Sequence, residues 1–237
     1  MSFNTWMPHA VASEANPWRG RIWRIVEAQH MASTMKIVDN AQEQDLLETL
    51  LEASKPAQPA TAAGLDYLLA TPFRYNPLRS GSRFRAVTDP GVFYGAESVR
   101  TACAELGYWR WKFLKDAVDL EKLEPVAHTA FAAEVSTSMV DLRQAPFSAD
   151  APAWQHPSDY SATQAFARVA RAAEVGAIQY RSVRDPSPAC CVALLTPTAF
   201  AKPKPLASMQ TWWLAVRGDS AIWRRDKDSM TFPAAAW

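Results

Sequence analysis

The amino-acid sequence predicts one domain of the α+β class, in which strands dominate and are interrupted by helices. Hydrophobic residues make up 49% of the 237 positions, which is ample material for a core. Segments rich in β-branched and aromatic residues recur without the strict strand–helix–strand alternation of a doubly wound sheet. Only 8 glycines are present, and neither of the glycine-rich phosphate-binding patterns of such sheets occurs.

The first half of the chain predicts one strand and one helix between irregular segments. In order, the predicted elements are an irregular leader (1–20), a strand (21–28), a helix (41–53), a proline- and alanine-rich linker (55–63) and an arginine-rich loop (71–85). Asp39 or Asn40 is placed to cap the helix, because a short polar side chain accepts a hydrogen bond from the first turn. Four leucines fall on one face of that helix, namely Leu46, Leu47, Leu50 and Leu51.

The second half predicts two helices among shorter strands. The strands are expected at 92–94, 131–135, 139–142, 177–180, 192–195, 211–216 and 221–224, and the helices at 98–115 and 162–174. Ser98 is placed to cap the first of these helices. The apolar face expected for that helix consists of Val99, Ala102, Leu106, Trp109 and Phe113. Residues 217–220 suit a hairpin turn between the last two strands.

Composition narrows the class of protein. The net charge of +1 argues against a dedicated binder of nucleic-acid backbones, which normally carries a basic excess. The three cysteines and four histidines show no metal-ligand spacing, so we expect reduced thiols and no metal. We find no secretory leader and no apolar run of membrane-spanning length, so we expect a cytoplasmic location.

Arginines and aromatic residues gathered in residues 71–105 form the first candidate ligand site. Guanidinium groups such as those of Arg74 and Arg83 bind phosphate oxygens through paired N–H groups, and a ring such as that of Tyr94 stacks on a flat ligand. A solvated basic loop whose aromatic residues fill the core has the same pattern, so both interpretations stay open.

Glu105 lies at the edge of the apolar stripe of its predicted helix, where desolvation raises the pKa of a carboxyl group. Such a carboxylate can bind a ribose hydroxyl or stabilise positive charge at an anomeric carbon. The alternative is a surface ion pair with Arg110.

Ser182 follows a predicted strand and suits either a ligand contact or a turn. Because no histidine is placed to activate it, we do not expect it to be a hydrolase nucleophile. Ser161 and Gln164 share the first turn of a helix, where either anion binding or simple capping is expected.

The order of these pieces along the chain resembles the RES domain, a family named for a recurring arginine, glutamate and serine. The matching pieces span about residues 21–197 and comprise residues 23–24, 81–84, 92–98, 101–105 and 180–184. The short strand–turn–helix spacing from Arg83 to Glu105 makes the ordered set more specific than any one piece.

The resemblance implies an ADP-ribosyltransferase-like fold, with split β-sheets, flanking helices and an NAD-binding cleft that has no glycine-rich loop. It implies the toxin of a type II toxin–antitoxin system that consumes NAD by hydrolysis or phosphorolysis of the nicotinamide–ribose bond, or by ADP-ribosyl transfer to a protein acceptor. The implied partner is an antitoxin with an Xre-like helix-turn-helix part, whose C-terminal part blocks the cleft. NAD is then the substrate, and no metal, membrane or direct nucleic-acid contact is expected.

The resemblance also assigns residues. It implies that Arg24 and Arg83 contact the NAD phosphates or ribose and that Tyr94 borders the nicotinamide. It implies that Glu105 orients the ribose and stabilises an oxocarbenium-like transition state, with Arg83 and Ser182 completing the catalytic set. The further candidates for NAD binding are Arg74, Ser161, Gln164 and Ser182.

We expect the whole domain to span residues 21–237, with two segments that depart from the minimal domain of the family. They are a helical insertion at about 30–70 and a tryptophan-containing C-terminal strand extension at about 206–237, so acceptor choice and oligomeric state are not transferred. Two other classes of function stay open, an RNA-directed toxin whose arginines and ten tryptophans bind single strands, and a non-catalytic interaction protein. A glycosidase using Glu97 and Glu105 is a further alternative, although nothing else indicates sugar binding.

Overall fold

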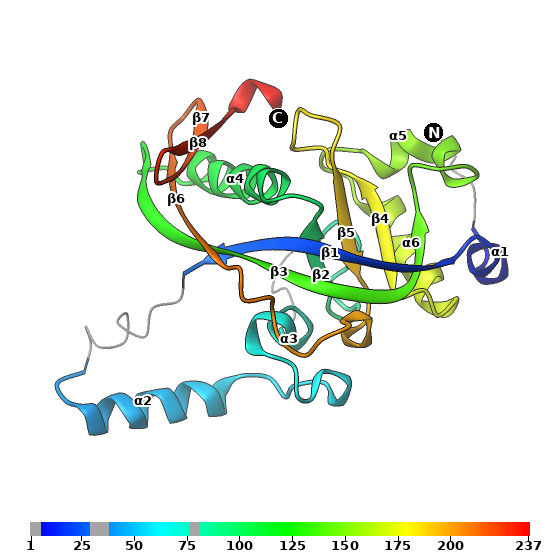
Figure 1. Ribbon diagram of the computed structural model, residues 1–237. Helices are drawn as coiled ribbons and strands as arrows, with labels where there is room; N and C mark the ends of the chain where they lie inside the picture. Colours follow the sequence, from blue (N-terminus) through cyan, green and yellow to red (C-terminus); the bar gives the residue numbers. More distant parts are fainter. Residues whose placement is uncertain (1–5, 29–37, 76–80) are drawn as a thin grey trace.

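Two long antiparallel strands run through the computed structural model, which describes residues 6–28, 38–75 and 81–237. Strand β1 (Asn16–Glu27) pairs along its full length with β3 (Leu123–Asp141). Figure 1 shows both strands crossing the molecule from side to side. His30 and Arg79, the latter in the predicted arginine-rich loop, lie outside the described residues.

Six further strands join this pair in one mixed sheet. They are β2 (Phe93–Ala96), β4 (Ala177–Arg181), β5 (Cys190–Leu194), β6 (Gln210–Val216), β7 (Ser220–Arg225) and β8 (Asp228–Pro233). The strand order is β1-β2-β5-β4-β3-β6-β7-β8, and the extra pairing of β1 with β3 closes the first five strands into a ring. Strands β6, β7 and β8 extend the sheet from the N-terminal half of β3. The predicted α+β class is confirmed, and the two parts of the sheet share β3.

Helices cover the sheet on both sides. They are α1 (Pro8–Ser13), α2 (Ala41–Ser54), α3 (Tyr67–Arg74), α4 (Val99–Asp116), α5 (Ala151–Trp154) and α6 (Ser161–Ala172). Short 3-10 helices lie at Ala60–Ala62, Phe147–Asp150, Pro197–Ala199 and Ala234–Ala236. In Figure 1, α4 lies on one side of the β1–β3 pair and α3 on the other.

The buried apolar side chains form two cores on the two faces of the sheet. The first core gathers side chains from α4 and α6 and contains Phe166 and Trp223, and the second gathers side chains from α3 and contains Phe131. Because successive side chains of a strand point to opposite faces, β1 supplies Ile25 to the first core and Ile22 to the second.

Helix α4 begins as predicted, because the Ser98 side chain accepts a hydrogen bond from the Thr101 backbone N–H. Its buried face differs from the predicted one, since the side chains of Trp109 and Phe113 are 45% and 54% exposed. The positions that pack inward include the small residues Ala102, Cys103, Ala104 and Gly107. The sheet comes so close to Gly107 that an added Cβ would meet the side chain of Ala221 at 3.2 Å. The large side chains of Trp109 and Phe113 are therefore displaced toward the surface, while Tyr108 and Leu114 pack inward.

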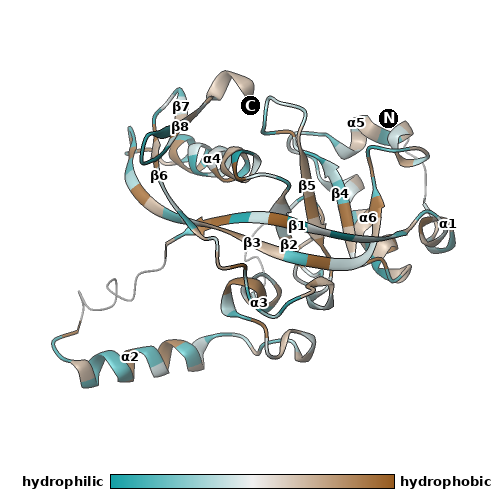
Figure 2. Cartoon of the chain, viewed as in Figure 1, coloured by the Kyte–Doolittle hydropathy of each residue, from teal (hydrophilic) through white to brown (hydrophobic). Residues whose placement is uncertain are grey.

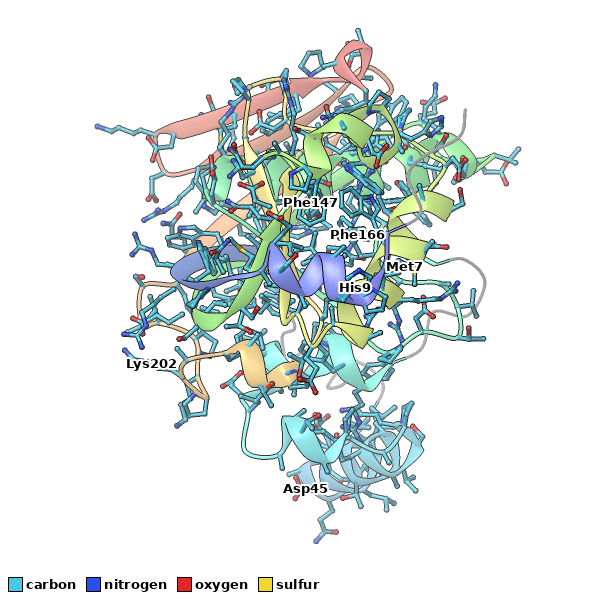
Figure 3. All side chains as sticks on the ribbon, turned by 90° about the vertical axis from the view of Figure 1, so that its right-hand side faces the viewer. Met7, His9, Asp45, Phe147, Phe166 and Lys202 are labelled. Carbon is cyan, nitrogen blue, oxygen red and sulfur yellow. The ribbon has the colours of Figure 1, made fainter. Side chains whose placement is uncertain are left out.

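The prediction of an irregular leader over residues 1–20 is wrong for the part that the structure describes. Pro8 begins α1, a position that suits proline because the first helical N–H has no intrahelical partner. The ring of Trp6 lies 4.6 Å from that of Phe147 and 6.3 Å from that of Phe166. Figure 3 shows Phe147 and Phe166 close to α1. Aromatic packing therefore orders a segment that has no apolar periodicity of its own.

Three other elements differ from the predicted ones. The predicted loop over 71–85 overlaps the last turn of α3, which contains Pro72. The strands predicted at 131–135 and 139–142 are parts of the single strand β3. Strand β8 was not predicted, because Phe232 is its one buried side chain and its apolar signal is weak.

Helix α2 matches its predicted bounds and cap, since the Asn40 side chain accepts a hydrogen bond from the Glu43 N–H. It projects from the body of the molecule in Figure 1, and Figure 2 shows hydrophilic and hydrophobic bands along it. Leu46 and Leu50 are exposed, and Arg74 of α3 joins Glu52 of α2 in an ion pair. Among the described residues, no helix is long and apolar enough to cross a membrane.

We expect Phe131→Ala to lower the free energy of unfolding by about 3–5 kcal/mol, because it empties a fully buried position in the second core. Urea unfolding followed by tryptophan fluorescence measures the loss. Val118→Ala is the control, because that side chain is 98% exposed and its loss should change stability by less than about 0.5 kcal/mol. Equal stability of the two variants would contradict the assignment of the second core.

Candidate functional site

A pocket of about 250 Å³ opens between α4 and the part of the sheet formed by β1, β2, β4 and β5. Four of the predicted site residues line it, namely Arg24, Arg83, Tyr94 and Glu105. The other lining residues that matter below are Trp23, Trp109, Tyr160, Tyr180, Arg184 and Cys191. Segments far apart in the sequence therefore meet at one cavity.

Glu105 lies within the pocket wall, held by neighbours on β5 and on the loop after β4. Its Oε1 atom accepts a hydrogen bond of 2.6 Å from the Ser182 hydroxyl and a longer one of 3.7 Å from the Cys191 thiol. Burial raises the pKa of Glu105 above 4.5, while the Ser182 hydrogen bond and the charges of Arg83 and Arg184 oppose that rise. The Oε2 atom forms no hydrogen bond with any described residue and remains available to a ligand.

The expected surface pair of Glu105 with Arg110 does not form, because Arg110 bonds Glu27 instead.

The Ser182 side chain bonds Glu105 and does not line the cavity. Its hydroxyl donates to Glu105, and its oxygen accepts hydrogen bonds from the backbone N–H groups of Arg184 (3.2 Å) and Asp185 (3.1 Å). The side chain is 3% exposed. The serine thus ties the loop after β4 to α4 and fixes the orientation of the carboxylate.

Arg83 presents an unoccupied edge to the pocket. Its Nη1 donates to the carbonyl oxygens of Trp154 and His156, and its guanidinium lies 4.7 Å from the centre of the Tyr160 ring. Its Nε and Nη2 atoms form no hydrogen bond with the described residues. That edge is the bidentate fork with which arginine binds phosphate or carboxylate oxygens.

The turn that carries Arg83 is fixed from two sides. The Tyr94 hydroxyl bonds the Ser82 hydroxyl at 2.7 Å and accepts a hydrogen bond from the Phe84 N–H. From α6, the Gln164 side chain donates to the carbonyl oxygens of Ser82 and Arg85. A Cβ added at Gly81 would lie 2.1 Å from the Arg85 carbonyl oxygen, so only glycine fits there.

Arg184 is a site residue that the sequence analysis left unassigned. It is 3% exposed, its guanidinium lies 3.4 Å from the centre of the Tyr108 ring, and its Nη2 bonds the Pro157 carbonyl oxygen. The Trp237 indole donates to the Arg184 carbonyl oxygen. The signal was available, because Arg184 ends the matched segment 180–184. Tyr160 and Cys191 gave no such signal.

Arg24 contributes to the pocket wall, and its guanidinium is held by β2. Its Nη1 donates to the Tyr94 carbonyl oxygen, and its Cζ lies 4.8 Å from the centre of the Phe93 ring, which belongs to the second core. Burial lowers the pKa of Arg24 to about 10, so the group stays positive at neutral pH. We therefore do not assign Arg24 a direct phosphate contact.

The remaining predicted ligand residues lie away from the cavity. Arg74 bonds Glu52 and the Pro56 carbonyl oxygen beside α2. Ser161 is exposed and takes part in the first turn of α6, where its N–H donates to Asp159. Gln164 supports the 81–85 turn, as described above. In the described ranges, no group of three or more histidine, cysteine or acidic side chains is arranged to hold a metal ion.

The arrangement combines two guanidinium groups with one carboxylate. Arg83 and Arg184 bond carbonyl oxygens, and Arg184 also bonds the Tyr160 hydroxyl, so these hydrogen bonds go to neutral acceptors. Glu105 is the carboxylate on which both positive charges act. Such a pocket suits a ligand that carries anionic oxygens near a centre of developing positive charge.

We expect Ser182→Ala to raise the pKa of Glu105 further, because the variant loses a hydrogen bond that favours the ionised form. Ionisation of Glu105 should then begin at a higher pH than in the parent chain. Carbon-13 NMR of labelled glutamate carboxyl groups measures the midpoint, and Glu105→Gln assigns the signal. Ser187→Ala, in the exposed part of the same loop, should leave the midpoint unchanged. An unchanged or lower midpoint in Ser182→Ala would contradict this assignment.

Comparison with known protein families identifies a domain in this chain. The RES domain matches residues 56–217, which is more than half of the chain. The matched part contains Arg83, Tyr94, Glu105 and Ser182. The chain is similar to a chain of the crystal structure of the M. tuberculosis MbcT–MbcA toxin–antitoxin complex, with 12% sequence identity, a TM-score of 0.48 and coverage of 96% of this chain and 92% of that chain. No curated protein matches. On the evidence of that domain match, the chain belongs to the RES domain family.

Proposed function

We propose that this protein is the toxin of a toxin–antitoxin system and that it binds NAD and breaks the nicotinamide–ribose bond. The observation that carries the proposal is the Ser182-bonded carboxylate of Glu105, which faces one cavity together with the guanidinium of Arg83. Membership of the RES domain family supports the same activity.

Glu105 supplies the electrostatic part of the reaction. Nicotinamide departs with the bonding electron pair, so positive charge develops at the anomeric carbon and its ring oxygen. The free Oε2 atom of Glu105 accepts a hydrogen bond from a ribose hydroxyl and places negative charge beside that centre. Ser182 is a positioning residue in this proposal, because its hydroxyl already bonds Glu105 and two backbone N–H groups.

Arg83 and Arg184 hold the pyrophosphate. The open Nε and Nη2 edge of Arg83 binds phosphate oxygens as a fork, and Arg184 adds a second positive charge from the loop after β4. Tyr94 and Tyr180 supply aromatic walls beside the nicotinamide. Because the substrate is held at both sides of the reacting bond, its orientation lowers the entropic part of the barrier.

The acceptor at the anomeric carbon is water, phosphate or a protein side chain, and each gives a different product. The bond that forms joins the anomeric carbon to an oxygen or nitrogen of the acceptor, whose proton passes to solvent. Product analysis by mass spectrometry separates ADP-ribose, its 1-phosphate and a modified protein.

We expect Glu105→Gln to lower the rate of nicotinamide release from NAD by on the order of 10²- to 10³-fold, the loss typical of one preorganised electrostatic group. Chromatography of free nicotinamide measures the rate. Glu121→Gln, an exposed carboxylate before β3, is the matched control and should retain full activity. Full activity in Glu105→Gln with an unchanged unfolding temperature would overturn the proposed role, and intact RNA beside falling NAD would exclude an RNA-directed toxin.

We expect induction of the parent chain in a bacterial host to arrest growth, and induction of Glu105→Gln at the same level to permit it. The proposed partner is an antitoxin with an Xre-like helix-turn-helix part whose C-terminal part occupies the pocket, so its co-expression should restore growth. Cell density and cellular NAD are measured together. Arrest by Glu105→Gln as strong as that by the parent chain would show that toxicity does not come from this site.

A further inference from the structure

Trp109 leaves a large apolar surface uncovered at the pocket. The residue follows Glu105 by one helical turn of α4, about 6 Å along the helix axis. Its side chain lines the pocket, yet 45% of the residue is exposed. An exposed indole beside a buried charged site is a surface on which a planar ligand can stack.

A second indole lies on another wall of the same pocket. Trp23 lines the pocket from β1, on the strand face that it shares with Ile25 of the first core. The Arg21 guanidinium lies 5.7 Å from the centre of the Trp23 ring. Both indoles therefore line the same cavity, Trp23 from β1 and Trp109 from α4.

Tyr108 connects Trp109 to the buried guanidinium of Arg184. Tyr108 has Arg184 over its face at 3.4 Å and Trp109 at its edge, with ring centroids 5.2 Å apart. A guanidinium and an exposed indole thus both contact one tyrosine, the first over its face and the second in a T-shaped contact. This sequence of groups matches a phosphate followed by a nucleobase.

The size of the cavity leads to the same arrangement. Its volume of about 250 Å³ is slightly below the ~300–1,000 Å³ of pockets that enclose a whole small ligand. A dinucleotide with its reacting ribose at Glu105 must therefore extend out of the cavity, and the exposed ring of Trp109 is one surface available to the part that extends.

We propose that Trp109, together with Trp23, forms the subsite that stacks the adenine ring of the substrate, which makes this protein selective for an adenine dinucleotide over nicotinamide mononucleotide. The inference rests on the proposed function for the identity of the ligand. Trp109 acts on binding of the adenosine half and has no part in bond breaking at Glu105.

Calorimetric titration with two probes tests the subsite. For Trp109→Ala, we expect the Kd of ADP-ribose to rise about tenfold, equivalent to about 1.4 kcal/mol and within the range for stacking of one base on an aromatic side chain. The Kd of nicotinamide mononucleotide, which has no adenosine, should stay within about twofold, a difference well below the loss of one stacked base. Trp109→Phe should restore most of the ADP-ribose affinity, since it retains an aromatic face.

Trp213→Ala is the matched control, because Trp213 is 51% exposed on β6 and does not line the pocket. It should leave both affinities unchanged. Equal weakening of both probes in Trp109→Ala, or an unchanged Kd for ADP-ribose, would overturn the adenine subsite.

The test separates this inference from the proposed function. If the parent chain binds ADP-ribose through Trp109 but releases no nicotinamide from NAD, the subsite stands and the catalytic proposal fails. If nicotinamide is released and Trp109→Ala raises the KM for NAD without changing kcat, both stand. If the parent chain binds neither probe, the subsite is wrong.

Discussion

The full-length pairing of β1 with β3 is the constraint on which both the sheet and the pocket depend. All twelve residues of β1 take part, so this pair joins β2 on one side to β4 and β6 on the other. The same register decides which side chains of β1 reach the pocket face. A shift by one residue would exchange Trp23 with Arg24 and place a cation where the indole now lies.

The second determinant of the pocket is the set of hydrogen bonds and charges that stabilise its buried ionisable groups. Glu105 loses water on burial, and this loss is offset by the hydroxyl of Ser182 and by two nearby guanidinium groups. Arg83 and Arg184 are themselves held by carbonyl oxygens, which orient them without neutralising them. The pocket is therefore preorganised for a ligand that carries both anionic oxygens and a carbon at which positive charge develops.

Sequence reasoning recovered the elements whose signals are local. The cap at Ser98, the helix over residues 99–116 and the hairpin at 217–220 follow from short-range chemistry, and the structure confirms them. Sequence reasoning did not recover which face of α4 is buried. That face is set by the close packing of β7 against Gly107, which depends on the tertiary structure. Tyr160 and Cys191 were missed for the same reason, since neither lies in a recognisable pattern.

By itself, the sequence determined the α+β class, most element bounds and the ordered set of Arg83, Tyr94, Glu105 and Ser182, because each depends on residue type and spacing along one chain. Tertiary structure alone decided that the Arg24 guanidinium bonds the Tyr94 carbonyl oxygen, that Arg74 pairs with α2 and that Arg184 joins the site. These outcomes depend on strand register and on contacts between distant segments, such as the hydrogen bond of Arg24 to Tyr94, 70 residues away, and that of Ser182 to Glu105, 77 residues away. No local pattern encodes the direction in which a long side chain points once several strands and helices meet.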